Sequence, residues 1–251
     1  MKPSIFPNLK RVHARRLREM YRSAGWPFQD VVEIELLACG LLERATDAKG
    51  VDCMRVTDAG IQYLAVAAQG NRNALTAHNA LVDKVALEMR TGGRLVWKGL
   101  QLRAALAGEE EGTNRWRMCV PDLFSIRNST VQAYLEPVVH EIKVSRADLL
   151  GDLKNEDKRN AYLSLSSQCW YVLGCNTKGE PIAAADEIPT ECGVMMCIDK
   201  RLEVVRMAPK RAMPELPFAT WMALAKAVPA DVSDQEEGRA QVPFAPVSAL
   251  A

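Results

Sequence analysis

The sequence predicts an α/β protein in two parts, a small N-terminal part and a larger part built around a β-sheet. Residues 118–126 and 133–144 are apolar and rich in β-branched side chains, which is typical of strands whose alternate residues face opposite sides. Residues 146–167 have helical spacing, and a further apolar strand is expected at residues 169–173. Two strands, a helix and a third strand in this order predict an α/β core for the larger part.

The composition fits a globular protein without a strong overall electric field. The chain has 251 residues, of which 48% are hydrophobic and 25% are charged, and its formal net charge is +1. Any nucleic-acid partner is therefore expected to bind local basic patches. No apolar run reaches the ~20 residues that a membrane span needs, and the N-terminus lacks the apolar core of a signal peptide. We expect a cytoplasmic protein with no membrane partner.

The cysteines favour the same compartment. The seven cysteines form an odd set with no Cys-x-x-Cys pair, and most have apolar neighbours, as at Cys39 and Cys197. Reduced cysteines buried in the core are the expectation. A zinc site is the alternative, but three histidines and these cysteine spacings give it little support.

The first 24 residues are basic. Seven lysines and arginines face a single acid, Glu19, and apolar residues recur near helical spacing. One interpretation is a helix whose basic face, with Arg11, Arg15 and Arg18, binds DNA phosphates. The equal alternative is a solvated helix face that is paired with acids elsewhere in the protein.

The next segments predict a second helix, a hairpin and a third helix. We expect the second helix at residues 27–39, the hairpin at 41–46 and 52–56, and the third helix at 59–68. This order, with Gly40 leading into the hairpin, resembles a winged-helix domain. The second helix exposes acids, including Asp30, Glu33 and Glu35, and has no basic residue, so its face repels phosphate. The domain is therefore expected to bind DNA through the first helix, or to bind a protein partner or form a homodimer.

A polar, glycine-containing stretch at residues 69–73 predicts the end of this domain. We therefore expect a winged-helix-like domain at residues 1–70, a second domain at 71–228 and a disordered tail at 229–251. The further elements expected in the second domain are a helix at 74–90, a strand at 94–102, a loop at 107–114 with solvated Glu109, Glu110 and Glu111, a hairpin at 193–197 and 201–207, and a helix at 217–228.

Two carboxylates and an ammonium group lie on the two central strands. Asp122 is on the first strand, and Glu141 and Lys143 share one face of the second. If these strands pair as a hairpin, Asp122 lies beside Glu141. Hard cations such as Mg²⁺ bind carboxylate oxygens, and the Ile142 carbonyl is placed to add another ligand. A bound metal acidifies water and stabilises charge on a phosphate, while Lys143 positions the water or balances the phosphate charge.

Pro121, Asp122, Glu141, Ile142 and Lys143 resemble the motif of the PD-(D/E)XK nuclease superfamily, whose core is restriction-endonuclease-like. The residues that follow Lys143 are similar to the MmcB-type branch, which is associated with DNA repair. The resemblance implies a deoxyribonuclease that depends on Mg²⁺ or Mn²⁺ and acts in DNA repair, replication, or mobile-element or defence biology.

The same resemblance implies another metal-binding acid on the helix before the first core strand. Asp83 and Glu88 are the candidates, and Asp83 is preferred by its distance from the glycines that end the helix. His78, on the same helix, is expected to be a core or capping histidine.

Other charged residues leave alternatives open. Lys154, Lys158 and Arg159 form a basic cluster that is expected to contact DNA phosphates. Asp148 and Asp152 share a helix face, and either resemble acids of the MmcB-type pattern or face solvent. His140 is expected to pack on the opposite strand face from Glu141, and a surface salt bridge of Lys143 is the structural alternative to a site.

Two further functions compete with the nuclease. The acidic second helix and the near-neutral charge are compatible with a non-catalytic DNA-binding or adaptor protein that retains the nuclease fold. A replication-initiation accessory protein is the third candidate, because the helix with His78, Leu81 and Val82 resembles the replication-relaxation family. The intact Asp122, Glu141 and Lys143 favour the enzyme.

Overall fold

The computed structural model describes residues 9–23, 25, 27–46, 49–108, 113–176, 178–199, 201–213 and 215–230. Contacts divide the chain into two compact units, Met1–Thr76 and Ala77–Ala251. The division falls inside one helix, α3 (Asp58–Thr91), whose first turns belong to unit 1 and whose later turns belong to unit 2. Each unit is described by itself.

Unit 1 contains two short helices, a hairpin and the start of α3. The elements are α1 (Arg11–Arg22), α2 (Val31–Ala38), β1 (Leu42–Thr46) and β2 (Asp52–Val56). The antiparallel pairing of β1 with β2 confirms the predicted hairpin. Its core combines Leu17 and Met20 of α1 with Leu36, Leu41 and Met54, all of them buried. The predicted second helix begins later than expected, at Val31, because Gln29 has a φ of 53° and Asp30 is an extended N-cap.

The gap expected between the helices at 59–68 and 74–90 is wrong, because α3 is continuous over 34 residues. Side chains within this stretch stabilise the helix: Gln69 Nε2 donates to Asn73 Oδ1 at 2.7 Å, and Arg72 Nη2 donates to Gln69 Oε1 at 2.7 Å. One glycine inside a helix, here Gly70, costs only about 1 kcal/mol. The helix therefore continues through the polar residues whose composition predicted a loop.

In the described part of unit 2, six strands form a mixed sheet in the order β10-β9-β8-β7-β6-β3. Their bounds are β3 (Arg94–Lys98), β6 (Leu123–Arg127), β7 (Val138–Lys143), β8 (Gln168–Leu173), β9 (Gly193–Ile198) and β10 (Arg201–Arg206). The neighbours β7, β8 and β9 run parallel, and the other pairs are antiparallel. The α/β class predicted for the larger part is confirmed at this level, as are the strand at 169–173 and the late hairpin.

Three predicted strands differ from the observed ones. The segment 118–126 is split between β5 (Asn114–Cys119) and β6, since Pro121 lacks the N–H that a continuous ladder needs. The segment 94–102 is likewise split between β3 and β4 (Leu102–Ala107) at Gly99, whose φ is 59°. The strand expected from residue 133 starts at Val138, after the 3-10 turn η1 (Gln132–Tyr134) and a Glu136 with φ of 41°.

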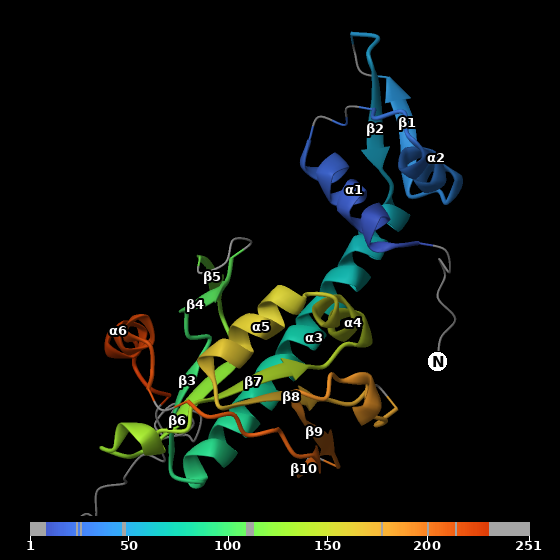
Figure 1. Cartoon of the computed structure of the whole chain (residues 1–251). Helices are drawn as coiled ribbons and strands as arrows, with labels where there is room; N and C mark the ends of the chain where they lie inside the picture. Colours follow the sequence, from blue (N-terminus) through green and yellow to red (C-terminus); the bar gives the residue numbers. More distant parts are fainter. Residues whose placement is uncertain are drawn as a thin grey trace, which may run out of the picture. The chain divides into compact units, whose positions relative to one another are not determined.

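Helices cover both faces of the sheet (Figure 1). The later turns of α3 pack on one face, where Val82 and Val85 meet Ile142 and Val172. On the other face, α4 (Arg146–Leu153) and α5 (Glu156–Leu165) pack with Val139, Tyr171 and Leu173 of the sheet. Burying one large side chain of this kind contributes about 1.5–3 kcal/mol. Successive residues of β7 and β8 thus alternate between the two layers, which fixes where Glu141 and Lys143 point.

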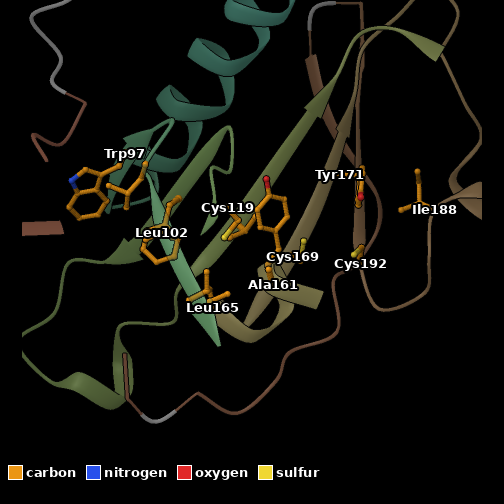
Figure 2. Packing of buried hydrophobic residues seen from close by; sticks show 14 of the residues in the cluster. Trp97, Leu102, Cys119, Ala161, Leu165, Cys169, Tyr171, Ile188 and Cys192 are labelled. Carbon is orange, nitrogen blue, oxygen red and sulfur yellow. The ribbon is translucent and has the colours of Figure 1, made fainter. Parts of the chain in front are cut away.

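The β4–β5 hairpin is a separate two-stranded sheet in unit 2. Figure 2 shows Leu102 of β4 and Cys119 of β5 in the same cluster as Ala161 and Leu165 of α5. The loop predicted between these strands includes Glu109, Glu110 and Glu111, which lie outside the described residues. The final helix is α6 (Phe218–Lys226), with Pro217 as its N-cap, and confirms the predicted helix.

The remaining sequence predictions concern the tail, the cysteines and the membrane. Ala230 N donates to Val96 O at 2.8 Å, and residues 231–251 of the expected tail lie outside the described residues. All seven cysteines are free; Cys119, Cys169 and Cys192 are buried as expected, while Cys39 is exposed. None of the helices described here combines the length and the apolar character that a membrane crossing requires.

Candidate functional site

Asp122 lies where the pairing of β6 with β7 stops. The last register pair is Leu123 with His140, so Asp122 and Glu141 are the next residues along the two strands. In place of a backbone bond, Asp122 Oδ2 accepts the Ile142 N–H at 2.7 Å. The N–H and C=O of one strand residue point to the same side, so the Ile142 carbonyl also faces the Asp122 side. The other carboxylate oxygen, Asp122 Oδ1, lies 3.2 Å from His78 Nε2 of α3.

Glu141 is a buried carboxylate with only one satisfied oxygen. Its side chain is 3% exposed, and its Oε1 accepts from Lys143 Nζ and from Lys158 Nζ, each at 2.6 Å. Its Oε2 is buried and has no hydrogen-bond partner among the described residues. The nearby Tyr162 hydroxyl donates to Val120 O at 3.1 Å; burial, followed by the charge of Glu141 and a hydrogen bond with it, raises the pKa of Tyr162. A buried carboxylate oxygen without a donor is costly, which makes Oε2 an acceptor available to a cation.

Asp152 joins the same ion cluster from α4. Its Oδ1 lies 2.6 Å from Lys158 Nζ and 3.5 Å from Lys143 Nζ, and its Oδ2 accepts from the Tyr171 hydroxyl at 2.8 Å. Burial opposes ionisation of Asp152 and is the largest influence, but the hydrogen bond from Lys158 and the two lysine charges outweigh it and lower its pKa. Burial likewise opposes the charge on Lys158, and the Glu141 charge and the two hydrogen bonds outweigh it and raise the pKa of Lys158.

The two lysines balance the two carboxylates of the cluster. Glu141 and Asp152 face the ammonium groups of Lys143 and Lys158. Asp122 contacts the Ile142 N–H and His78 instead. A cation at Asp122 and Glu141 would compete with the lysines for Glu141, and ammonium groups released from this pairing would be free to donate to an anionic substrate.

Asp122 contacts the backbone of Ile142 and Glu141 contacts Lys143, whereas Asp83 lies elsewhere. Asp83 Oδ1 lies 2.6 Å from Lys98 Nζ, and the Asp83 side chain is 45% exposed. Asp83 and His78 are five positions apart on α3, so they project about 140° apart around a helix with 3.6 residues per turn. His78 faces Asp122, and Asp83 therefore faces away from it.

The three residues of the predicted basic cluster have different environments. Lys158 belongs to the ion cluster around Glu141. Arg159 Nε donates to Glu191 Oε1 at 2.9 Å, and its Nη1 donates to Leu153 O at 3.1 Å. Lys154 lines a hollow of about 390 Å³ over the turn between α4 and α5. Of these three side chains, Lys154 is the one that the structure leaves in a surface hollow.

Sequence reasoning gave His78 a packing or capping role and left open whether Asp152 belongs to the site or faces solvent. His78 was expected to pack or cap, yet it contacts Asp122, and its position before Leu81 and Val82 on α3 would place it on the sheet side. Asp152 and Lys158 are six residues apart on different helices, and no helical spacing relates them. The intervening Asn155 is the signal that could have revealed the turn, because it caps α5 by accepting the Lys158 N–H.

His140 is packed on the face opposite Glu141, as predicted. It is fully buried, and neither ring nitrogen has a hydrogen-bond partner among the described residues. Burial, followed by the charge of Arg94, lowers the pKa of His140 from 6.5 to about 3. This histidine is therefore neutral at ordinary pH and belongs to the core.

The arginines predicted to bind DNA lie on α1 in unit 1. Arg15 Nε lies 3.1 Å from Glu19 Oε1, and Arg18 Nε donates to Ala14 O at 3.1 Å. Arg11 is exposed. The expected acidic face of the second helix is partly internal, since Glu33 is buried and accepts the Phe28 N–H at 2.6 Å. Asp30 is bound by Arg16, with its Oδ2 2.8 Å from Arg16 Nη2.

A metal would have to be held by two carboxylates and a backbone carbonyl. Within the residues that the structure describes, no group of three or more His, Cys, Asp and Glu side chains is arranged to hold a metal ion. The set formed by Asp122, Glu141 and the Ile142 carbonyl is smaller in side chains, but it matches the oxygen ligands that Mg²⁺ prefers, which usually include several waters. The unpartnered Glu141 Oε2 fits such a cation.

Comparisons with known proteins identify no family for this chain. No family model and no curated protein matches it. Among solved structures, it is similar to a protein of unknown function from Silicibacter pomeroyi, with 20% sequence identity. The alignment covers 57% of this chain and 77% of that chain, with a TM-score of 0.36.

Proposed function

We propose that the chain is a metal-dependent nuclease that hydrolyses phosphodiester bonds in DNA. The observation that carries this proposal is the bond from the Ile142 N–H to Asp122, which fixes the Asp122 carboxylate at the backbone of the residue that follows Glu141. Glu141 adds a buried oxygen that lacks a donor, and Lys143 lies on the same strand face. This combination supports the PD-(D/E)XK resemblance of the motif.

Asp122, Glu141 and the Ile142 carbonyl would hold a divalent cation, Mg²⁺ or Mn²⁺. When bound, such a cation acidifies water and stabilises negative charge on a phosphate. Asp122 is already oriented for this role, because the Ile142 N–H and His78 each contact one of its oxygens. Metal-binding side chains that are already held in position reduce the entropy cost of binding the cation.

The two lysines supply hydrogen-bond donors to the substrate. Lys143 and Lys158 both donate to Glu141 Oε1, so their ammonium groups converge on one point. An ammonium group donates strongly to phosphate oxygens and to the lone pairs of an attacking water. In the proposed mechanism, Lys143 orients the water and Lys158 binds a phosphate oxygen. Asp152 keeps Lys158 in place through its own 2.6 Å contact.

The two units have separate roles in this proposal. The sheet of unit 2, with α3 on one face and α4 and α5 on the other, is compatible with a restriction-endonuclease-like core. The order of α1, α2, β1, β2 and α3 in unit 1 is compatible with a winged-helix-like domain. Its exposed α1 arginines would bind DNA phosphates, and α2 would serve a protein partner or a second copy.

A DNA cleavage assay tests the proposed activity. Single-stranded, duplex and forked DNA are incubated with Mg²⁺ or Mn²⁺, and with EDTA as the metal-free reference. Asp122→Asn keeps an acceptor for the Ile142 N–H and removes the charge, so we expect a fold like wild type and a loss of cleavage of about a hundredfold or more. Asp83→Asn is the matched control, because Asp83 is paired with Lys98. Equal cleavage by wild type and Asp122→Asn would contradict the proposal.

A second candidate is a DNA-binding or adaptor protein that has kept the fold without turnover. The observation that favours it is the closed state of the ion cluster, in which Glu141 is 3% exposed and two ammonium groups already bind its Oε1. A structural network of this kind neutralises carboxylates without any substrate. Binding of DNA with no cleavage under any metal condition, by wild type as by Asp122→Asn, would favour this second function.

A further inference from the structure

The β4–β5 hairpin presents an outer face on which Trp116 is exposed, while Met118 on the same face lines a hollow with Met222 of α6. Its inner face buries Leu102, Ala104 and Leu106 in the cluster that includes α5. The register pairs Arg103 with Met118 and Ala105 with Trp116, so these four residues lie on the opposite, outer face. An exposed tryptophan and methionine on one side of a hairpin form an apolar patch of the type found at interaction sites.

The Trp116 side chain is exposed and is restrained by a neighbouring arginine. It is 52% exposed, and the guanidinium carbon of Arg103 lies 4.5 Å from the centre of its ring. This cation–π contact restrains both side chains before any ligand arrives. Met118, beside it, is 60% exposed. The opposite residue, Ala105, is too small to cover the indole, so the ring keeps accessible surface.

The two strands of the hairpin carry three arginines, and the sequence between them carries Glu109, Glu110 and Glu111, so the formal charges of the whole hairpin balance. Arg115 Nη2 lies 2.9 Å from Asp157 Oδ1, and Arg117 Nη1 lies 3.3 Å from Asp157 Oδ2, so two guanidinium groups share one carboxylate. Within the part of the chain that the structure describes, Arg103 has an aromatic partner and no acidic one. The positive charge on the outer face is therefore that of Arg103, which can contact a phosphate next to a base that stacks on Trp116.

The hairpin is continuous with the candidate site. Strand β5 ends at Cys119 and leads through Val120 and Pro121 directly to Asp122. Val120 O accepts from the hydroxyl of Tyr162, whose ring lies 5.4 Å from Lys158 Nζ. A strand of nucleic acid that lies on the hairpin would therefore extend along β5 toward the Asp122 and Glu141 carboxylates.

We propose that the outer face of the β4–β5 hairpin binds unpaired bases of a DNA strand, with Trp116 as the stacking platform. This inference rests on the proposed nuclease function and names its substrate class as DNA with a single-stranded segment. An indole face stacks on the face of a base, and an arginine beside it contributes both stacking and phosphate contact. In a duplex the faces of the bases are already covered by their neighbours, so Trp116 discriminates in favour of unpaired DNA.

The test measures DNA binding in EDTA, so that cleavage plays no part. Fluorescence anisotropy is recorded with a labelled oligothymidine strand and with a blunt duplex that has the same number of phosphates. We expect Trp116→Ala to weaken single-strand binding about tenfold, because one base–aromatic stack is lost. Trp116→Phe should retain most of the affinity. Tyr134→Ala is the matched control, since Tyr134 is also an exposed aromatic residue, at 63%, and lies on η1.

Several outcomes would overturn this inference. They are equal single-strand binding by wild type and Trp116→Ala, an equal loss on the duplex, no binding of the single strand by wild type, or a change in sedimentation that assigns the face to a second copy of the chain. Asp122→Asn separates the inference from the proposed function. Suppose that Trp116→Ala lowers single-strand affinity while wild type and Asp122→Asn both fail to cleave. This result would support base stacking on Trp116 and contradict the proposed nuclease activity.

Discussion

Lys158 Nζ lies 2.6 Å from Glu141 Oε1, so an ammonium group of α5 meets a carboxylate of the central strand β7. The same nitrogen lies 2.6 Å from Asp152 Oδ1 of α4. One side chain thus links two helices to the sheet at the point where the proposed chemistry takes place. The sequence predicted Lys158 as a DNA contact, and the structure places it inside the ion cluster that the substrate would have to reach.

Replacing Lys158 should destabilise the fold. Lys158→Met keeps much of the side-chain volume but leaves Asp152 and Glu141 with a single shared lysine, and breaking a buried ion pair costs about 3–5 kcal/mol. We expect the lower part of this range, because Lys143 remains within reach of both carboxylates. Urea unfolding gives the free energy. Lys154→Met is the matched control and should unfold like wild type; an equal stability of the two variants would contradict the role of Lys158.

Divalent cations should stabilise the native protein if the carboxylates bind them. A ligand that binds only the native state raises its stability, by about 2.7 kcal/mol at a hundredfold excess over its Kd. We expect Mn²⁺ and Mg²⁺ to raise the melting temperature of wild type and of Asp83→Asn. Glu141→Gln should lose this increase, because it removes the charge next to the unpartnered oxygen. An increase of the same size in Glu141→Gln would place the cation elsewhere.

The α1 arginines should contribute a salt-dependent part of DNA affinity. Changing Arg11, Arg15 and Arg18 together to glutamine removes three charges from exposed positions of α1. Each lost phosphate contact lowers the slope of log affinity against log salt by about one. Arg16→Gln is an informative contrast, since Arg16 binds Asp30 and should affect the stability of unit 1 instead. A triple variant with the wild-type slope would exclude α1 as a DNA anchor.

The sequence predicted the strand faces around Glu141 better than the element boundaries. Alternation along residues 133–144 correctly separated Glu141 and Lys143 from Ile142, since a pleated strand leaves no other arrangement. The helical break at residues 69–73 failed because side-chain bonds within α3 compensate for its polar composition. Long-range partners such as His78 with Asp122 are set by packing of α3 on the sheet, which local patterns do not encode.

Because local patterns do not encode long-range contacts, the sequence also did not separate the environments of Lys154, Lys158 and Arg159. Composition identified Lys154, Lys158 and Arg159 as one basic cluster, because a sequence shows neighbours along the chain. The turn between α4 and α5 sends Lys158 toward Glu141 and Arg159 toward Glu191. Only the position of the turn, set by the Asn155 cap, decides which basic residue enters the site.

His140 should make the protein less stable in mild acid. Its pKa falls from 6.5 to about 3 in the folded protein, because burial and the Arg94 charge disfavour the protonated ring. Between these two values the unfolded chain binds a proton that the native state does not, so the free energy of unfolding decreases as the pH decreases. The loss of stability approaches about 1.4 kcal/mol for each pH unit. Above pH 6.5 this contribution is absent, since the ring is neutral in both states.

Substitution of His140 isolates this effect. His140→Leu places an apolar side chain in the same buried position and removes the titrating group, so its stability should decrease less steeply than that of wild type as the pH decreases from 6.5. Urea unfolding at a series of pH values measures the difference between the two slopes. The carboxylates titrate in both proteins and cancel in this comparison. Parallel curves for wild type and His140→Leu would mean that the ring of His140 is protonated inside the folded protein, at a pH well above the pKa that its burial implies.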